Sequence, residues 1–212
     1  MNKTRLEAFS DGVFAIVITL LVLDIRPDVP GGTGWTMFVH AGPKILIYAL
    51  SFILVGLYWV SHHNMLQFVE HTDRLFLWLN LLLLLVVAFI PYPAALLSST
   101  HADTGSLCIY VATLSLANIL GAAVWFHATK GNRLVSSRIP ADFVRFVYII
   151  HLAPVGVYFL AGLLAWQLKG VSLFLVALVP AFYVLPNPFI ERRVRAAHAA
   201  IKKTEPHGSE AR

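Results

Sequence analysis

The sequence predicts an all-α integral membrane protein with six transmembrane helices, and two observations support this fold class. First, 58% of the 212 residues are hydrophobic and only 13% are charged, whereas a typical soluble domain has about 45–50% and about 25%. A soluble fold of this length cannot bury that much apolar surface. Second, the apolar residues form six continuous stretches, whereas membrane barrels need strands of alternating polarity. Helices therefore satisfy the backbone inside the bilayer.

Each apolar stretch has about the length that a bilayer crossing needs, roughly 20 residues. Polar or Gly/Pro-containing segments separate the stretches, and Pro154 and Pro180 fall inside the last two. The second stretch leaves room for a helix that continues past His62. The predicted helices span residues 8–25, 45–61, 75–97, 106–128, 143–168 and 171–190.

The distribution of Lys and Arg predicts that both termini are cytoplasmic. If the N-terminus is inside, all but three of the 16 Lys and Arg residues fall on the cytoplasmic side, as the positive-inside rule requires. The exceptions are Arg26, Lys44 and Lys169. Two cytoplasmic termini require an even number of crossings, which six helices provide. We expect residues 1–201 to form one six-helix transmembrane domain in the plasma membrane and residues 202–212 to form a polar, disordered tail.

Charge and motif content exclude several function classes. The net charge of +5 favours contact with anionic lipid headgroups over nucleic acid, because the basic residues flank the apolar segments. No nucleophile–base pair or phosphate-binding loop is visible, so we expect no enzyme activity. We expect His127 and His151 at the membrane interface and no bound metal. The spacing of a zinc site is missing from the polar cluster after helix two: His62, His63, Glu70, His71 and Asp73.

The first helix carries the most informative residues. Asp11 lies just inside the apolar stretch, and an ionisable residue at membrane depth usually marks a functional site or a partner. Alternatively, Ser10 and Asp11 cap the first turn of the helix, and spacing alone leaves both interpretations open. Ile16, Leu20 and Leu23 share one helical stripe at i, i+4 and i+7. Such a stripe by itself is typical of contact with lipid or another helix.

An Arg-x-x-x-Phe-Ser-Asp motif leads from Arg5 into helix one, and an isoleucine, a threonine and two leucines follow at fixed spacing. This pattern resembles the signature of the transmembrane protein 175 family of potassium channels. Animal members hold two six-helix repeats, whereas this chain has one motif and so is similar to the prokaryotic members, which form homotetramers. The residues that carry the resemblance are Arg5, Phe9, Ser10, Asp11, Ile16, Thr19, Leu20 and Leu23.

The resemblance implies a passive K⁺ channel whose central pore is lined by helix one of each subunit, with no cofactor. Ile16 would form the narrowest ring, and Leu20 and Leu23 would form further rings toward the outside. Such apolar rings close a pore by dewetting. Thr19 would add a hydroxyl layer that coordinates a partly dehydrated cation; alternatively, its hydroxyl bonds to the carbonyl of Ala15.

Two further assignments concern the ends of helix one. Asp24 at the outer end would concentrate cations at the mouth; alternatively, it is a loop carboxylate paired with Arg26. At the inner end, we expect Ser10 and Asp11 to bond to neighbouring helices as a structural latch, because buried polar groups need partners. The candidate partners are His62, His63 and Asn80.

The potassium filter sequence Thr-Val-Gly-Tyr-Gly is absent, so we expect weaker discrimination against Na⁺ than a carbonyl cage provides. The alternative function is a proton-coupled secondary transporter in which Asp11 and the histidines relay protons. Transporters often show internal repeats and broken helices, and neither is evident in this sequence.

Overall fold

The computed structural model describes residues 3–26, 32–136, 139–184 and 192–197. Five helical stretches in these residues are long and apolar enough to cross a membrane. A further apolar helix, α8 (Lys169–Val184), has 16 residues, and residues 185–190 of the predicted sixth span lie outside the described part. The five stretches are Lys3–Asp24, Gly42–Gln67, Arg74–Ser99, Thr104–Asn132 and Ala141–Leu164.

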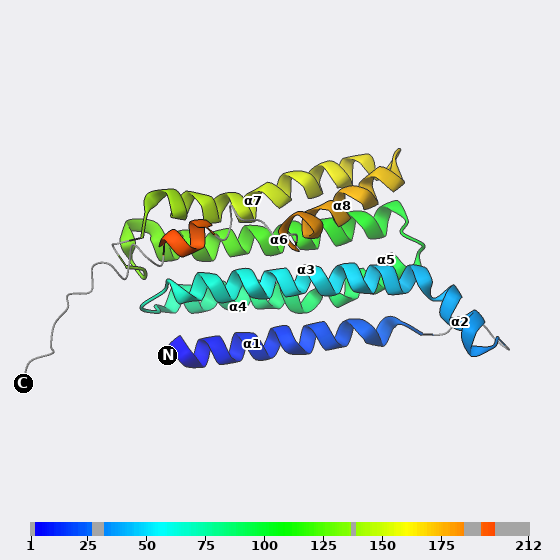
Figure 1. Cartoon of the computed structure of the whole chain (residues 1–212), viewed down its shortest axis with the longest axis horizontal. Helices are drawn as coiled ribbons and strands as arrows, with labels where there is room; N and C mark the ends of the chain where they lie inside the picture. The colour runs from blue at the N-terminus through cyan, green and yellow to red at the C-terminus, as the bar shows by residue number, and fades with distance from the viewer. Residues whose placement is uncertain (1–2, 27–31, 137–138, 185–191, 198–212) are drawn as a thin grey trace, which may run out of the picture.

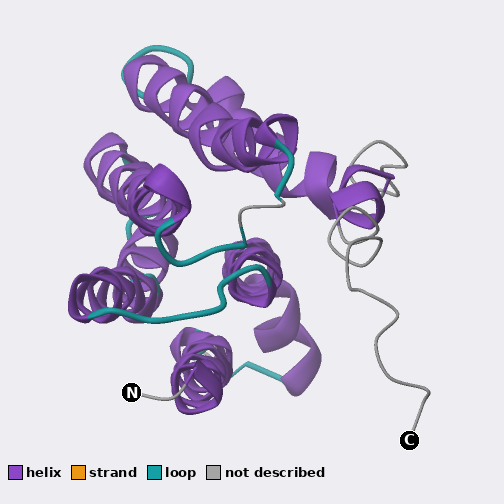
Figure 2. Cartoon of the chain, turned by 90° about the vertical axis from the view of Figure 1, so that its left-hand side faces the viewer, coloured by secondary structure: helices purple, strands orange, loops and turns teal. Residues whose placement is uncertain are grey.

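The long helices run roughly parallel to one another as a bundle, with α1 (Lys3–Leu20) along one edge (Figure 1). α1 contacts α3 (Gly42–Gln67) and α4 (Arg74–Phe89), while α6 (Thr104–Thr129) packs against α4, α5 (Pro91–Ser99) and α7 (Ala141–Leu164). Figure 2 views this bundle along the helix axes and shows the described elements as helices and loops. The all-helical prediction is thus confirmed for the described residues.

The helix boundaries differ from the predicted ones in informative ways. α1 begins at Lys3 and continues into a 3-10 turn, η1 (Leu21–Asp24). Ser10 and Asp11 therefore lie about two turns inside the helix, and the interpretation that they cap it is wrong. The third predicted helix divides into α4 and α5 at Ile90, because Pro91 is tolerated at the first position of a new helix.

A short helix, α2 (Gly34–His40), lies between the first two predicted transmembrane helices. Thr33 caps it, since the Thr36 N–H donates to Thr33 Oγ1 over 3.3 Å. Side-chain capping of this kind needs only a local sequence signal. The apolar stretch after it becomes α3, which extends past His62 to Gln67 as the sequence allows.

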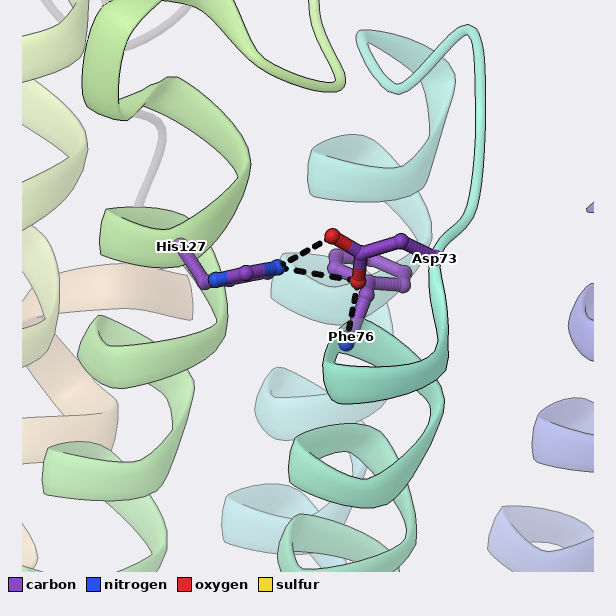
Figure 3. Close-up of polar contacts among 3 residues, drawn as sticks. All are labelled: Asp73, Phe76 and His127. Atoms are coloured by element: carbon purple, nitrogen blue, oxygen red, sulfur yellow. Dashed lines mark hydrogen bonds and ion pairs between the residues drawn. The ribbon is translucent and has the colours of Figure 1, made fainter.

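Asp73 caps α4 and also ties it to α6. Its Oδ1 accepts the Phe76 N–H over 2.7 Å, and His127 Nε2 lies 2.9 and 2.8 Å from the two carboxylate oxygens (Figure 3). Desolvation raises the pKa of Asp73, but the hydrogen bonds from Phe76 and His127 outweigh it and hold that pKa below its usual value. His127 is therefore buried against Asp73, and its predicted place at the membrane interface stays a prediction.

The same end of the bundle is fastened by its two connecting loops. Val69 and Val135 form an isolated antiparallel bridge, and the Glu70 N–H donates to the Leu134 carbonyl over 2.8 Å. The loop between α3 and α4 is thus joined to the loop between α6 and α7. These contacts fix the ends of four helices relative to one another.

Hydroxyl and amide groups connect α3 to α6 across the interior. Tyr58 donates to the Leu114 carbonyl over 3.0 Å and accepts from Asn118 Nδ2 over 2.8 Å. The hydroxyls of Ser51 and Tyr110 lie 2.8 Å apart. Polar groups in an apolar interior are costly unless they are bonded, so these pairs set the spacing of the two helices.

Candidate functional site

α1 has two faces of opposite character. One face packs into the bundle and is buried at Leu6, Ser10, Phe14, Val17 and Leu21, every third or fourth residue. The opposite face is covered by no other described part of the chain. It holds the residues that the sequence singles out: Arg5, Phe9, Gly12, Ile16, Thr19, Leu20 and Leu23.

The three apolar side chains of the predicted stripe are among the exposed ones. Ile16 is 60% exposed, Leu20 42% and Leu23 62%. The structure thus places them on a single open face of α1. Their assignment as pore rings remains a prediction.

The open face of α1 differs in composition from the exposed face of α4. Large side chains dominate the exposed face of α4, including Leu81, Leu82 and Leu85. On α1, small residues alternate with the large ones: Gly12 is exposed, and a Cβ there would meet nothing within 4 Å. Small residues on a membrane helix allow other helices to approach closely, so this face is suited to assembly.

Thr19 lies on the open face with one hydrogen bond of its own. Its hydroxyl donates to the Ile16 carbonyl over 2.8 Å, three residues back rather than to Ala15 as the alternative expected. A hydroxyl keeps its acceptor lone pairs when it donates. Thr19 can therefore present an oxygen to the solvent or to an ion while its rotamer is fixed by the backbone.

Asp24 is exposed at the end of η1. The Arg26 N–H donates to the Asp24 backbone carbonyl over 2.9 Å, but within this described stretch the two side chains form no ion pair. Lys44 Nζ instead lies 3.5 Å from the Arg26 carbonyl. The pairing of Asp24 with Arg26 is thus a backbone contact, and the carboxylate itself faces outward.

Ser10 begins a buried chain of hydrogen bonds that runs through three helices. Asn80 Nδ2 donates to Ser10 Oγ over 3.2 Å, and Asn80 Oδ1 lies 2.7 Å from His62 Nε2. Because an amide oxygen only accepts, His62 Nε2 is the donor and the proton-bearing nitrogen. All three side chains are buried, so α1, α4 and α3 are linked by polar contacts inside the bundle.

Asp11 has a different partner from the predicted ones. Trp59 Nε1 donates to Asp11 Oδ1 over 2.8 Å. The structure does not bring His63 to the motif: its Nε2 lies 3.1 Å from Gln67 Nε2, and its ring lies 5.9 Å from that of Trp59. Trp59 could have been found from the sequence, because it precedes His63 by one helical turn.

The remaining motif residues, Arg5 and Phe9, are exposed on the open face of α1 and are not brought to Ser10 or Asp11. Within the described residues, no group of three or more His, Cys, Asp or Glu side chains is arranged to hold a metal ion. The hydrogen-bonded Ser10 thus lies on the face of α1 that packs into the bundle, and the apolar stripe lies on the opposite face.

Comparison with known proteins connects this geometry to a family. Residues 5–91, which cover α1 from Arg5 onward together with α2, α3 and α4, match the family model described as endosomal/lysosomal potassium channel TMEM175. A potassium channel of Streptomyces collinus is 40% identical over 153 residues, which cover 68% of this chain and 74% of the relative. The chain belongs to the TMEM175 family. The family prediction made from the motif in helix one is confirmed.

Other relatives of this TMEM175 chain agree in fold and size. A potassium channel of a Chryseobacterium species is 30% identical over 198 residues, covering 92% of this chain and 99% of the relative. The crystal structure of a TMEM175 homologue from Chamaesiphon minutus matches with a TM-score of 0.74 at 29% identity, covering 86% of this chain and 96% of that one. The TMEM175 fold and its apolar helices identify a multi-pass membrane protein.

The animal relatives are longer. The Bos taurus protein named endosomal/lysosomal proton channel TMEM175 is 33% identical, and the match covers 95% of this chain but 46% of the bovine protein. This chain therefore has the length of its bacterial relatives and about half the length of that animal one.

Proposed function

We propose that the chain is one subunit of a homotetrameric channel that conducts K⁺ passively across the plasma membrane. The open face of α1 carries this proposal, because it combines exposed apolar side chains with small residues and has no partner in the described chain. A lone helix bundle encloses no pore, whereas copies related by rotation can surround one. The bacterial relatives named potassium channels support the same activity.

In this tetramer the residues of α1 act in layers along the ion path. Ile16, Leu20 and Leu23 form apolar rings that block hydrated ions when the neck is dry. Thr19 supplies hydroxyl oxygens next to these rings, and Asp24 raises the local cation concentration at the outer mouth. The permeant species is a monovalent cation, and the mechanism needs no cofactor.

The hydrogen bonds that join Ser10, Asn80 and His62 act as a structural latch on the buried face of α1. It holds one face of the helix against α3 and α4, so that the opposite face points to the axis. Arg5 and Phe9 lie at the inner end of that open face, where they meet the neighbouring subunits.

We assign six crossings with both termini in the cytoplasm, and the place of the last described helical residues supports this assignment. Residues 192–197 are helical and lie toward the same end of the bundle as the start of α1 (Figure 1). Lys3, Arg74 and Arg133 belong to the predicted cytoplasmic side, which carries 13 of the 16 Lys and Arg residues. We assign residues 1–201 to the channel domain; the tail at 202–212 lies outside the described residues.

The alternative, a proton-coupled transporter, makes a different prediction for ion flux. Purified protein in liposomes with an outward K⁺ gradient is expected to release K⁺ without any proton gradient, and the rate should follow the membrane potential. A strict requirement for an opposing proton gradient would contradict the channel and favour the transporter.

A further inference from the structure

A long cavity of about 180 Å³ lies within the subunit between α3, α6, α7 and α8, and Val194 near the C-terminus also lines it. Its lining on α3 runs from Leu54 to Phe68, roughly 20 Å at 1.5 Å per residue. At the Phe68 end, the centre of the Phe68 ring lies 4.7 Å from that of Phe143 at the start of α7. Val60 belongs to the lining and is 44% exposed, so the cavity reaches the surface of the subunit.

The interior of this cavity suits hydrocarbon. The described residues that line it include no Asp, Glu, Lys or Arg. Polar side chains in the lining are already bonded to the protein: Tyr58 donates to the Leu114 carbonyl and accepts from Asn118, and Tyr183 donates to the Ile150 carbonyl over 2.9 Å. A polar occupant would lose its hydration there with little in return, whereas an apolar chain gains from leaving water.

The Phe68 end of the cavity is bordered by arginines. Phe146 and Val194 both line the cavity, and Arg193 Cζ lies 5.3 Å from the centre of the Phe146 ring. Arg145 directly precedes Phe146 on α7 and is exposed. A guanidinium group carries five N–H donors, so Arg193 can bind an anion in addition to its present contacts.

The two segments that meet at Phe146 are strongly basic. Residues 141–146 and 192–197 together contain four arginines and one acidic residue, Asp142. They lie at the end of the bundle that the proposed topology places in the cytoplasm, at the depth of the lipid headgroups. Arginine binds phosphate through paired N–H groups, and basic pockets between membrane helices bind anionic headgroups. The charge at this end of the cavity thus complements an anionic headgroup.

We propose that the cavity binds one anionic phospholipid. An acyl chain enters between the helices, and Arg145 and Arg193 hold the phosphate. Half of the hydrocarbon core of a bilayer is about 15 Å thick, so one acyl chain fills most of the length of the cavity. The site combines a basic border with an apolar interior, so it selects a lipid over a soluble anion and an anionic lipid over a neutral one. This binding does not depend on ion conduction.

The headgroup test compares phosphatidylglycerol with phosphatidylcholine that carries the same palmitoyl and oleoyl chains. Each lipid is titrated into the full chain in a neutral detergent, and bound lipid is counted by native mass spectrometry. We expect phosphatidylglycerol to bind at least about 5-fold more tightly, the ratio that one basic residue near a headgroup provides. Equal binding of the two lipids would overturn the proposal.

A pair of double variants tests the arginines. Arg145→Gln with Arg193→Gln should remove the preference for phosphatidylglycerol. The control, Lys44→Gln with Lys169→Gln, removes two positive charges at the starts of α3 and α8, away from Phe68, and should keep the preference. Loss of the preference in both double variants would contradict the site. Arg145→Gln alone, at an exposed position, should weaken phosphatidylglycerol binding about 5-fold; unchanged binding in this single variant would remove Arg145 from the site.

A second pair of variants tests the cavity. Leu57→Trp narrows it and should weaken phosphatidylglycerol binding about 10-fold, because overpacking opposes the bound chain. Ile53→Trp, one turn earlier on α3, is exposed and outside the lining, and it should bind normally. Equal binding in both variants would contradict the cavity as the place of the acyl chain. Glycerol 3-phosphate, which has the phosphate without the chains, should not displace the lipid at equal concentration; displacement would overturn the lipid as the occupant.

Discussion

The Asn80 side chain donates a hydrogen bond to the Ser10 hydroxyl over 3.2 Å and thereby fixes the rotation of α1 about its own axis. Ser10 lies on the buried face, so the opposite face, with Ile16 and Leu23, must point out of the subunit. A helix rotated by one residue would turn by 100°, because a turn contains 3.6 residues, and would carry Ile16 off that open face. The hydrogen bond at Ser10 therefore also determines that the apolar stripe of α1 faces out of the subunit.

Removal of the latch should change both stability and conduction. The substitution Asn80→Leu leaves Ser10 and His62 buried without partners, at a cost of about 1–3 kcal/mol in the free energy of unfolding. The control is Asn118→Leu, which removes a comparably buried amide that bonds Tyr58 and the Leu114 carbonyl. We expect lower thermal unfolding midpoints in both variants but altered liposome K⁺ flux only in Asn80→Leu. The same flux change in both would argue against a latch on α1.

The ring assignment predicts a gain of conductance. The substitution Ile16→Asn places a polar ring in the neck, so water enters and K⁺ flux should rise with some loss of selectivity. Leu85→Asn on α4 serves as the control, because Leu85 is 66% exposed and outside α1, and its flux should match the unchanged chain. If Leu20→Asn alters flux and Ile16→Asn does not, the narrowest ring lies at Leu20.

The close approach of His151 to α6 predicts a site that tolerates no side chain. Gly121→Ala puts a Cβ 2.5 Å from the ring, and overpacking of this kind costs about 1–3 kcal/mol. Gly156→Ala on α7 is the control, since its Cβ meets nothing within 4 Å. Thermal unfolding in detergent should show a lower midpoint for Gly121→Ala alone. Recovery in the double variant with His151→Ala would tie the loss to this contact; no recovery would place its cause elsewhere.

The Asp73 cap predicts a pH-dependent contribution to stability. Its pKa in the folded chain lies below the usual value of 3.8, so the stabilisation is present above that value and is lost as pH falls through the folded-state pKa. At pH 7, Asp73→Ala should lower the free energy of unfolding by about 1–2 kcal/mol. The difference from the unchanged chain should shrink as the pH is lowered below the usual value.

Asp103 provides the matched control, because it caps α6 through the Ser106 N–H over 2.7 Å and is not the carboxylate that bonds His127. Asp103→Ala should lose a helix cap and contacts with Ser106 and Thr100 but no imidazole partner, and so destabilise less than Asp73→Ala. Equal unfolding midpoints for the two variants would show that the His127 contact contributes nothing measurable.

Composition and helical periodicity were sufficient to predict the fold class, because a membrane helix is specified by a local run of apolar residues. The open face of α1 could also be predicted, since Ile16, Leu20 and Leu23 recur at helical spacing. The boundary between α4 and α5 at Ile90 was harder to predict, because Pro91 permits either a kink or the start of a new helix. Local signals thus determine the helices but leave their breaks ambiguous.

The polar contacts between helices were harder to predict, because they join residues far apart in the chain. Asp11 and Trp59 are 48 positions apart, and Asp73 and His127 are 54 apart. The need of a buried serine for a partner indicated that Ser10 would be bonded, but only the packing selects Asn80. The structure buries the His151 ring over Gly121, and the sequence around His151 could not indicate this contact because the glycine lies on another helix.

The central claim, that the open face of α1 lines the ion path, is tested most directly by cysteine accessibility. In a chain with Cys108→Ser, the one native cysteine is removed, and Ile16→Cys and Leu85→Cys are compared in proteoliposomes. A small, water-soluble cationic methanethiosulfonate reagent should abolish K⁺ flux through Ile16→Cys and leave Leu85→Cys unchanged. Unchanged flux through modified Ile16→Cys, established by mass spectrometry of the labelled protein, would contradict the claim.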